Sequence, residues 1–154
     1  MRTSAAGLAL IEESEGRRHR AYLDGGGVPT IGVGHTRGVR LGQVATDEQI
    51  DAWLAQDVEE AEATILRHIT GKVFMTLPQP AWDALVSFVL NLGEQAFVNR
   101  NGSLTGIGRA LNAERYDDVA AQMLRWVYDN GRRIQGLVNR RKREIAMWKS
   151  GWDS

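Results

Sequence analysis

Residues 21–35 read AYLDGGGVPTIGVGH, a composition unlike that of the chain around them. Three glycines in a row stand in the first half of this segment, and a proline, β-branched residues and further glycines follow. Glycine and proline are poor helix formers, whereas β-branched residues favour strands. The pattern therefore predicts two short strands joined by a glycine-rich turn.

Helical patterns stand on both sides of this segment. Before it, Thr3 or Ser4 can cap a helix that runs to about Glu15. After it, Thr46 is followed three residues later by Gln49, which is the pattern of a capping box at the start of a helix. Apolar residues then recur at helical spacing as far as residue 69, which predicts the longest helix of the chain.

Glycines and prolines mark the ends of the remaining helices. Gly71 is expected to end the longest helix, and the prolines at 78 and 80 to begin the next one, which stops at Gly93. Further helices are predicted over residues 104–112, 116–128 and 137–149. The chain therefore reads as one domain over residues 1–154, with a glycine-rich β element at about 17–40 packed beside a helical body at about 46–150. This is an α+β fold, in which a cleft between the two parts is a natural place for a ligand.

The composition is that of an ordinary globular protein. The chain has 154 residues, of which 43% are hydrophobic and 25% are charged. Nineteen basic residues balance nineteen acidic ones, so the net charge gives no general attraction to nucleic acid, and no nucleic-acid partner is expected. No apolar run approaches the roughly 18 residues that a membrane-spanning helix needs, so stable membrane insertion is not expected. No secretion signal is recognised either, which predicts accumulation in the cytoplasm.

The chain has no cysteine, which excludes disulfides, thiolate nucleophiles and cysteine metal sites. The three histidines do not stand at a helical metal-ligand spacing. The segment 125–149 is rich in basic residues, and four of them are consecutive at 140–143. Because a helix can turn only part of such a run to water, some of these side chains are expected to face an acidic partner, inside or outside the protein.

Two carboxylates are the best candidates for chemistry. The chain lacks a nucleophile elbow, a phosphate-binding loop and a zinc-protease motif. Glu15 is expected at the end of the first helix, and Asp24 in the glycine turn that follows, so both can reach one cleft. A protonated and an ionised carboxyl group on either side of a bond are the minimum requirement for hydrolysing a glycoside. From spacing alone, a surface glutamate and an ordinary turn aspartate remain equally open interpretations.

The wider pattern resembles a known signature. Glu15, Asp24 and Thr30 are separated by eight and five residues, and this resembles the active-site signature of the phage-type lysozymes, glycoside hydrolase family 24. In that family the pattern is Glu, eight residues, Asp or Cys, five residues, Thr. The likeness continues in residues 84–93, which resemble the family's central helix, and in residues 131–143, which resemble its C-terminal helical segment.

The resemblance implies a lysozyme-like fold and a muramidase without cofactor or metal. Such an enzyme cuts the β-1,4 bond between N-acetylmuramic acid and N-acetylglucosamine in bacterial peptidoglycan, with inversion at the sugar carbon. It implies that Glu15 is the general acid, and that Asp24 and Thr30 position the attacking water or assist the oxocarbenium-like transition state. Arg140 matches the arginine that contacts the catalytic glutamate in this family.

Three further residues have supporting interpretations in the same frame. His35 is expected beside the site in a structural role. Tyr22 either packs under the site or touches sugar. Asn91 either hydrogen-bonds the substrate or makes capping and helix contacts.

The resemblance also implies a biological setting, that of a phage endolysin which lyses the host cell. We expect the protein to stay in the host bacterial cytoplasm until a holin permeabilises the membrane, and then to act as a monomer on the cell wall or in the periplasm. Two alternatives stay open. A lytic transglycosylase on the same scaffold needs one acid and no bound water, so it would not require Asp24 or Thr30. A non-catalytic protein would disrupt wall or membrane through its basic C-terminal helix.

Overall fold

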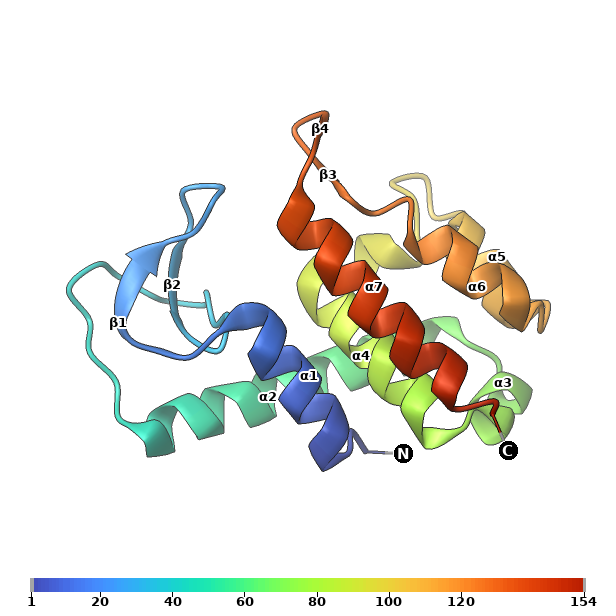
Figure 1. The fold of residues 1–154 in the computed structure, drawn as a ribbon, viewed down its shortest axis with the longest axis horizontal. Helices are drawn as coiled ribbons and strands as arrows, with labels where there is room; N and C mark the ends of the chain where they lie inside the picture. The colour runs from blue at the N-terminus through green and yellow to red at the C-terminus, as the bar shows by residue number, and fades with distance from the viewer. Residues whose placement is uncertain (1, 154) are drawn as a thin grey trace.

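A computed structural model describes residues 2–153 and shows a small antiparallel hairpin beside a helical body (Figure 1). Helix α1 (Ala5–Glu15) is capped by Ser4, whose side chain accepts a hydrogen bond from the amide of Gly7. It leads into strands β1 (Arg18–Leu23) and β2 (Pro29–Gly32), which pair antiparallel around the glycine turn. The α+β class and the glycine-rich hairpin are thus confirmed.

Helix α2 (Asp47–His68) connects the hairpin with the helical body (Figure 1). Its capping box is present: the amide of Gln49 donates to the Thr46 hydroxyl at 3.2 Å, and the amide of Thr46 donates to the Gln49 side chain at 3.4 Å. Near its start, Ile50 is fully buried against Gly32 of β2, where a β-carbon would lie 3.2 Å from the Ile50 side chain. The first turns of α2 therefore pack against β2 of the hairpin.

The predicted end of this helix is wrong. Helix α2 ends at His68, and Gly71 begins a short further helix, α3 (Gly71–Thr76). The Thr70 hydroxyl accepts a hydrogen bond from the amide of Val73 at 3.2 Å and caps α3. A threonine cap satisfies a free amide at a helix start, and this signal outweighed the stop expected from glycine.

Helix α4 (Gln79–Leu92) forms the centre of the helical body. All of residues 81–89 are buried, because α1, α2 and α7 (Gln135–Ser150) pack around it. Asp83 on α4 accepts hydrogen bonds from the amide and the hydroxyl of Ser4, so the start of α1 is tied to α4. Gly93 ends α4 with a φ of 75°, as the sequence predicts.

The chain between α4 and α7 contains a second hairpin that the sequence analysis missed. After η1 (Glu94–Ala96), α5 (Gly106–Asn112) and α6 (Tyr116–Met123), the strands β3 (Tyr128–Asp129) and β4 (Arg132–Arg133) pair antiparallel. The helix predicted over 116–128 is therefore too long, and the helical body at 46–150 includes a small sheet. Asn130 and Gly131 take φ values of 51° and 77°, which suit the tight turn.

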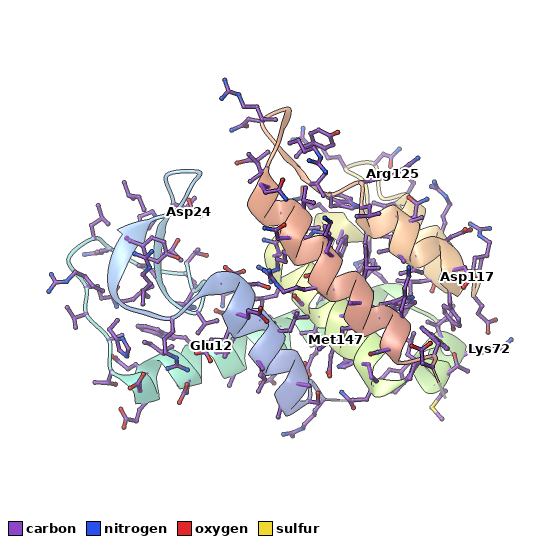
Figure 2. All side chains as sticks on the ribbon, in the orientation of Figure 1. Glu12, Asp24, Lys72, Asp117, Arg125 and Met147 are labelled. Atoms are coloured by element: carbon purple, nitrogen blue, oxygen red, sulfur yellow. The ribbon has the colours of Figure 1, made fainter. Side chains whose placement is uncertain are left out.

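Figure 2 shows Asp24 at the hairpin and Asp117 of α6 at the opposite end of the molecule. Within residues 2–153, no helix is long and apolar enough to cross a membrane.

Candidate active site

Glu15 lies at the point where α1, the segment after β2 and helix α7 meet. It is the last residue of α1, and Gly16 ends the helix with a φ of 75°. Its side chain is 22% exposed. Gly34 passes so close that a β-carbon there would lie 2.7 Å from the Glu15 carboxyl group, and the φ of Gly34 is 70°. Glycine at position 34 therefore lets the backbone approach the carboxylate.

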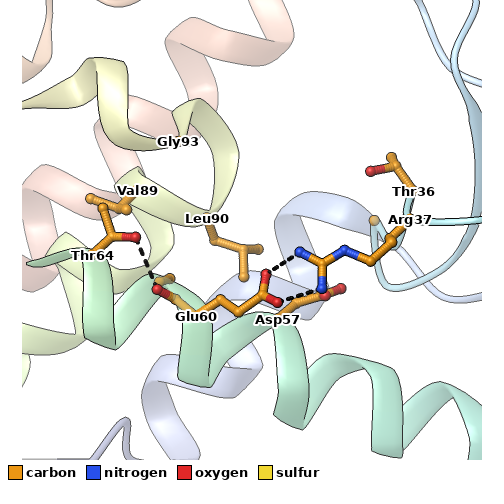
Figure 3. Close-up of a pocket in the computed structure, with 10 residues that line it drawn as sticks. Thr36, Arg37, Asp57, Glu60, Thr64, Val89, Leu90 and Gly93 are labelled. Carbon is orange, nitrogen blue, oxygen red and sulfur yellow. Dashed lines mark hydrogen bonds and ion pairs between the residues drawn. The ribbon is translucent and has the colours of Figure 1, made fainter.

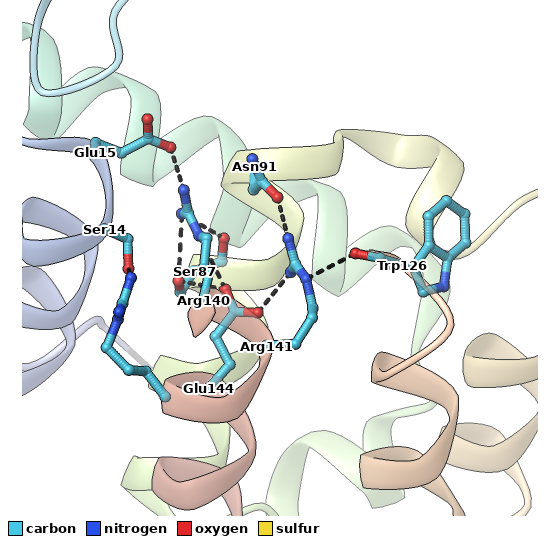
Figure 4. A network of polar contacts seen from close by, with 9 residues as sticks. Ser14, Glu15, Ser87, Asn91, Trp126, Arg140, Arg141 and Glu144 are labelled. Carbon is cyan, nitrogen blue, oxygen red and sulfur yellow. Dashed lines mark hydrogen bonds and ion pairs between the residues drawn. The ribbon is translucent and has the colours of Figure 1, made fainter. Parts of the chain in front are cut away.

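Arg140 holds Glu15 from the helical side (Figure 4). Its Nη1 donates a hydrogen bond to Glu15 Oε1. The rest of the guanidinium group is occupied: Nη2 donates to the carbonyl of Ser87 at 3.0 Å, and Nε donates to Glu144 Oε2 at 3.2 Å. Arg140 is 4% exposed. Its position is thus set by α4 and by its own helix, and one N–H group is directed at Glu15.

Arg141 extends this network away from Glu15. Its Nη1 donates to Glu144 Oε1, its Nε donates to the carbonyl of Trp126 at 3.1 Å, and its Nη2 donates to the side-chain oxygen of Asn91. The guanidinium also lies over the ring of Phe88, 4.9 Å from its centroid. Burial lowers the pKa of Arg141, and the charge of Glu144 opposes this effect.

Glu144 is the residue of this network that the sequence analysis missed. The prediction that part of the basic run 140–143 faces an acidic partner is confirmed, since Arg140 contacts Glu15 and both Arg140 and Arg141 contact Glu144. A signal was present, because Glu144 stands four residues after Arg140 and three after Arg141, spacings at which side chains meet on a helix.

Asp24 is exposed in the hairpin turn, where it organises the backbone. Its Oδ1 accepts hydrogen bonds from the amides of Gly26 at 2.9 Å and Val28 at 2.8 Å. None of residues 2–153 donates a hydrogen bond to its Oδ2. One carboxylate oxygen therefore shapes the turn, and the other is left to interact with solvent or substrate.

Thr30 and Tyr22 face each other across the hairpin. Thr30 is buried, and its hydroxyl donates to the carbonyl of Val28 at 2.9 Å, so the oxygen of Thr30 can still accept. Tyr22 is half-buried beneath the guanidinium of Arg18, which lies 4.5 Å from the ring centroid. Burial and the charge of nearby Glu15 raise the pKa of Tyr22.

His35 and Asn91 contact supporting side chains. His35 is buried, its Nδ1 lies 2.8 Å from Asp57 Oδ2, and its ring stacks on Trp53 at 4.8 Å. These contacts hold the segment after β2 against α2. The side-chain oxygen of Asn91 is taken by Arg141. The structure therefore brings Glu15 and Arg140 together, places Tyr22, Asp24 and Thr30 on the hairpin, and assigns His35 and Asn91 to the surrounding contacts.

A cavity of about 240 Å³ opens beside this junction, between the segment after β2, helix α2 and the end of α4 (Figure 3). Gly34, whose backbone leaves no room for a β-carbon beside Glu15, is part of its wall. Arg37 and Glu60 close one side through two hydrogen bonds of 2.6 and 2.8 Å. Within residues 2–153, no group of three or more histidine and carboxylate side chains is arranged to hold a metal ion.

A family model described as phage lysozyme matches residues 12–144, the span from the end of α1 to Glu144. The chain belongs to the phage lysozyme family. Membership places it among the enzymes that hydrolyse peptidoglycan. The endolysin of Acyrthosiphon pisum secondary endosymbiont phage 1 is 36% identical over 154 residues, covering 97% of this chain and 99% of that relative.

Solved structures confirm the lysozyme-like fold of the chain. The active form of the P1 phage endolysin Lyz matches with a TM-score of 0.85 and 31% identity, covering 100% of this chain and 88% of that one. The muramidase domain of SpmX from Asticaccaulis excentricus matches with a TM-score of 0.79 and 30% identity, covering 96% and 97%.

Proposed function

We propose that this member of the phage lysozyme family is an endolysin that hydrolyses the β-1,4 bond between N-acetylmuramic acid and N-acetylglucosamine, with Glu15 as the general acid. The observation that carries the proposal is the placement of Glu15. It is partly buried at the junction of hairpin and helical body, held by Arg140 and approached by Gly34. The similarity to an endolysin and to a muramidase domain supports the same reaction.

The carboxyl group of Glu15 offers two different oxygens. Because Oε1 accepts a hydrogen bond from Arg140, the proton to be transferred belongs on Oε2. Glu15 then donates this proton to the glycosidic oxygen as the bond between that oxygen and the anomeric carbon breaks. Positive charge develops on the sugar ring at this stage, and the leaving sugar departs as an alcohol.

Asp24 and Thr30 supply the other half of an inverting reaction. The hydroxyl of Thr30 already donates to Val28, so it accepts a hydrogen bond from the attacking water. The free Oδ2 of Asp24 accepts a proton from that water as its oxygen bonds to the anomeric carbon. Water attacks from the face opposite the leaving group, which inverts the configuration.

Analysis of the products tests this proposal. Purified peptidoglycan should release fragments with reducing ends, and the first product seen by proton NMR should have the inverted anomeric configuration. Anhydro ends would instead establish a lytic transglycosylase, which needs neither Asp24 nor Thr30. Lysis without any cleaved glycan would establish a non-catalytic protein. The burial of Arg140 and Arg141 counts against that last reading, because it removes half of the basic run 140–143 from the surface.

The proposed biological setting is lysis of a bacterial host from within. The protein stays in the host cytoplasm until a holin permeabilises the membrane, and then acts as a monomer on the wall. Expression in a bacterial host should cause lysis only when a holin is expressed as well. Light scattering coupled to size-exclusion chromatography should give a mass near the 17.1 kDa of one chain.

A further inference from the structure

Glu144 is a fully buried carboxylate whose charge no part of the proposed reaction uses directly. Three donors surround it: the Ser87 hydroxyl at 2.6 Å, Arg140 Nε at 3.2 Å and Arg141 Nη1 (Figure 4). A buried carboxylate is costly unless its hydrogen bonds and its charge are satisfied. Both the hydrogen bonds and the charge of Glu144 are satisfied. Arg140 contacts Glu144 and Glu15 at the same time, so it links the two carboxylates.

The charges of this network cancel. Glu15 and Glu144 carry one negative charge each when ionised, and Arg140 and Arg141 carry one positive charge each. Arg140 is shared between the two carboxylates. Without the charge of Glu144, Glu15 would be the one carboxylate left in a network with two guanidinium groups, of which Arg140 contacts it directly and Arg141 does not.

We infer that Glu144 is a positioning residue for Glu15: it fixes Arg140 so that a single N–H reaches the carboxyl group, and it offsets the positive charge that would otherwise keep Glu15 ionised. A general acid must be protonated before it reacts, and neighbouring cations favour its ionised form. Glu144 therefore lets Arg140 orient Glu15 without driving the loss of the proton that Glu15 has to donate. This inference rests on the proposed role of Glu15.

The other groups around Glu15 and Glu144 do not replace this charge. On the hairpin side, burial and the charge of Glu15 raise the pKa of Tyr22, so Tyr22 is neutral at neutral pH. On the α4 side, Ser87 and Asn91 are uncharged. On the α1 side, Ser14 contacts Arg143. Arg143 carries a further positive charge, but its Nη2 donates to the Ser14 hydroxyl at 3.2 Å and not to either carboxylate. The charges in direct contact with Glu15 or Glu144 are therefore those of Arg140 and Arg141.

The variant Glu144→Gln tests the inference, since it keeps the shape and removes the charge. We expect the high-pH limb of kcat/KM on solubilised peptidoglycan to move down by about one pH unit, with a loss of about tenfold above that limb. KM should stay unchanged, because Glu144 is buried and does not touch the substrate. Carbon NMR of the Glu15 carboxyl group should show its proton leaving at lower pH than in the parent chain.

Two further variants separate charge from structure. Ser87→Ala removes a neutral partner of Glu144 and should leave the pH limb in place. The double variant Arg141→Met with Glu144→Gln removes one charge of each sign, so the limb should return towards that of the parent. It serves as the test even where Glu144→Gln alone fails to fold.

An unchanged titration of Glu15 in Glu144→Gln would overturn the inference, and so would an equal shift in Ser87→Ala. If only the double variant Arg141→Met with Glu144→Gln folds, a high-pH limb of kcat/KM that lies about one pH unit below that of the parent would also overturn the inference. The NMR titration does not depend on activity, so this failure is distinct from a failure of the proposed reaction.

Discussion

In the β1–β2 hairpin, Asp24 and Thr30 bond to backbone atoms two to four residues away, whereas Glu15 and Arg140 meet across 125 residues of sequence. The hairpin side is organised by local turn chemistry. The helical side is organised by side chains from α1, α4 and α7 that meet only in the folded chain. Structural damage from changes in the turn should therefore stay local, while changes in the buried network should affect both the position of Glu15 and the stability of the whole fold.

The largest effect is expected from breaking the network at Arg140. Arg140→Met leaves Glu144 and Glu15 without their shared partner, so the free energy of unfolding should fall by about 3–5 kcal/mol, as for other broken buried ion pairs. Activity should fall with it, since Glu15 loses its orienting N–H. Urea denaturation measures the first effect. Lys142→Met, on the exposed side of the same helix, is the control and should change the free energy of unfolding by less than about 0.5 kcal/mol. Equal losses of stability in the two variants would show that the buried network does not stabilise the fold.

The next largest effect separates chemistry from turn formation in the hairpin. Asp24→Asn keeps a side-chain oxygen for the amides of Gly26 and Val28 but removes the negative charge. Its hydrolysis rate should fall about 100-fold, a typical size for losing a general base, while its melting temperature stays near that of the parent. Asp24→Ala should lose both activity and stability. Full activity in Asp24→Asn would contradict the role of Asp24 as a general base and would show that Asp24 only organises the turn.

A smaller effect is expected at Gly34, where the segment after β2 approaches Glu15. Gly34→Ala places a β-carbon against the Glu15 carboxyl group in a left-handed conformation, which should cost about 1–2 kcal/mol for the conformation alone and also displace Glu15. Gly38→Ala is the matched control, because its φ of 69° carries the same conformational cost and its β-carbon would meet nothing within 4 Å. Both variants should lose stability, but only Gly34→Ala should lose activity. Equal activities would mean that this contact does not position Glu15.

The smallest effect is expected at an exposed ion pair that is not part of the Glu15 network. A hydrogen bond with His68 lowers the pKa of exposed Glu94. The stabilisation from this lowered pKa is present above the ordinary range of a glutamate and disappears as the pH falls through the pKa of the folded state. Glu94→Gln should therefore lower the urea midpoint slightly at about pH 6 and leave it unchanged at about pH 3. A larger loss at the lower pH would contradict this sign.

The comparison also explains how much could be predicted from the sequence. The glycine turn, the capping box at Thr46 and the stop at Gly93 depend on residues that are close in sequence, and these were predicted. The hairpin around Asn130 and Gly131 was missed although its turn signal is local, because its two strands are only two residues each. The cap at Thr70 is not apparent from the sequence, because the glycine that follows it favours the end of a helix as well as a start.

The helical side of the site was only half predictable. The Glu15–Arg140 contact followed from family resemblance, since nothing local relates two residues so far apart. Glu144 has a local relation to both arginines, but an exposed helix would show the same spacing. Only packing against Ser87 of α4 shows that it is buried. Side-chain networks between distant elements depend on the fold, and sequence spacing does not reveal them.

The most direct test of the account is the rate at which Glu15→Gln releases reducing ends from purified peptidoglycan, compared with the rate of the parent chain. A melting temperature equal to that of the parent shows that the variant is folded. Glutamine keeps the shape of the side chain and can still accept from Arg140, but it has no proton to give to the glycosidic oxygen. The account predicts a loss of about a thousandfold or more in a folded protein. A folded variant that cleaves as fast as the parent would contradict it, and the acid would have to be sought elsewhere.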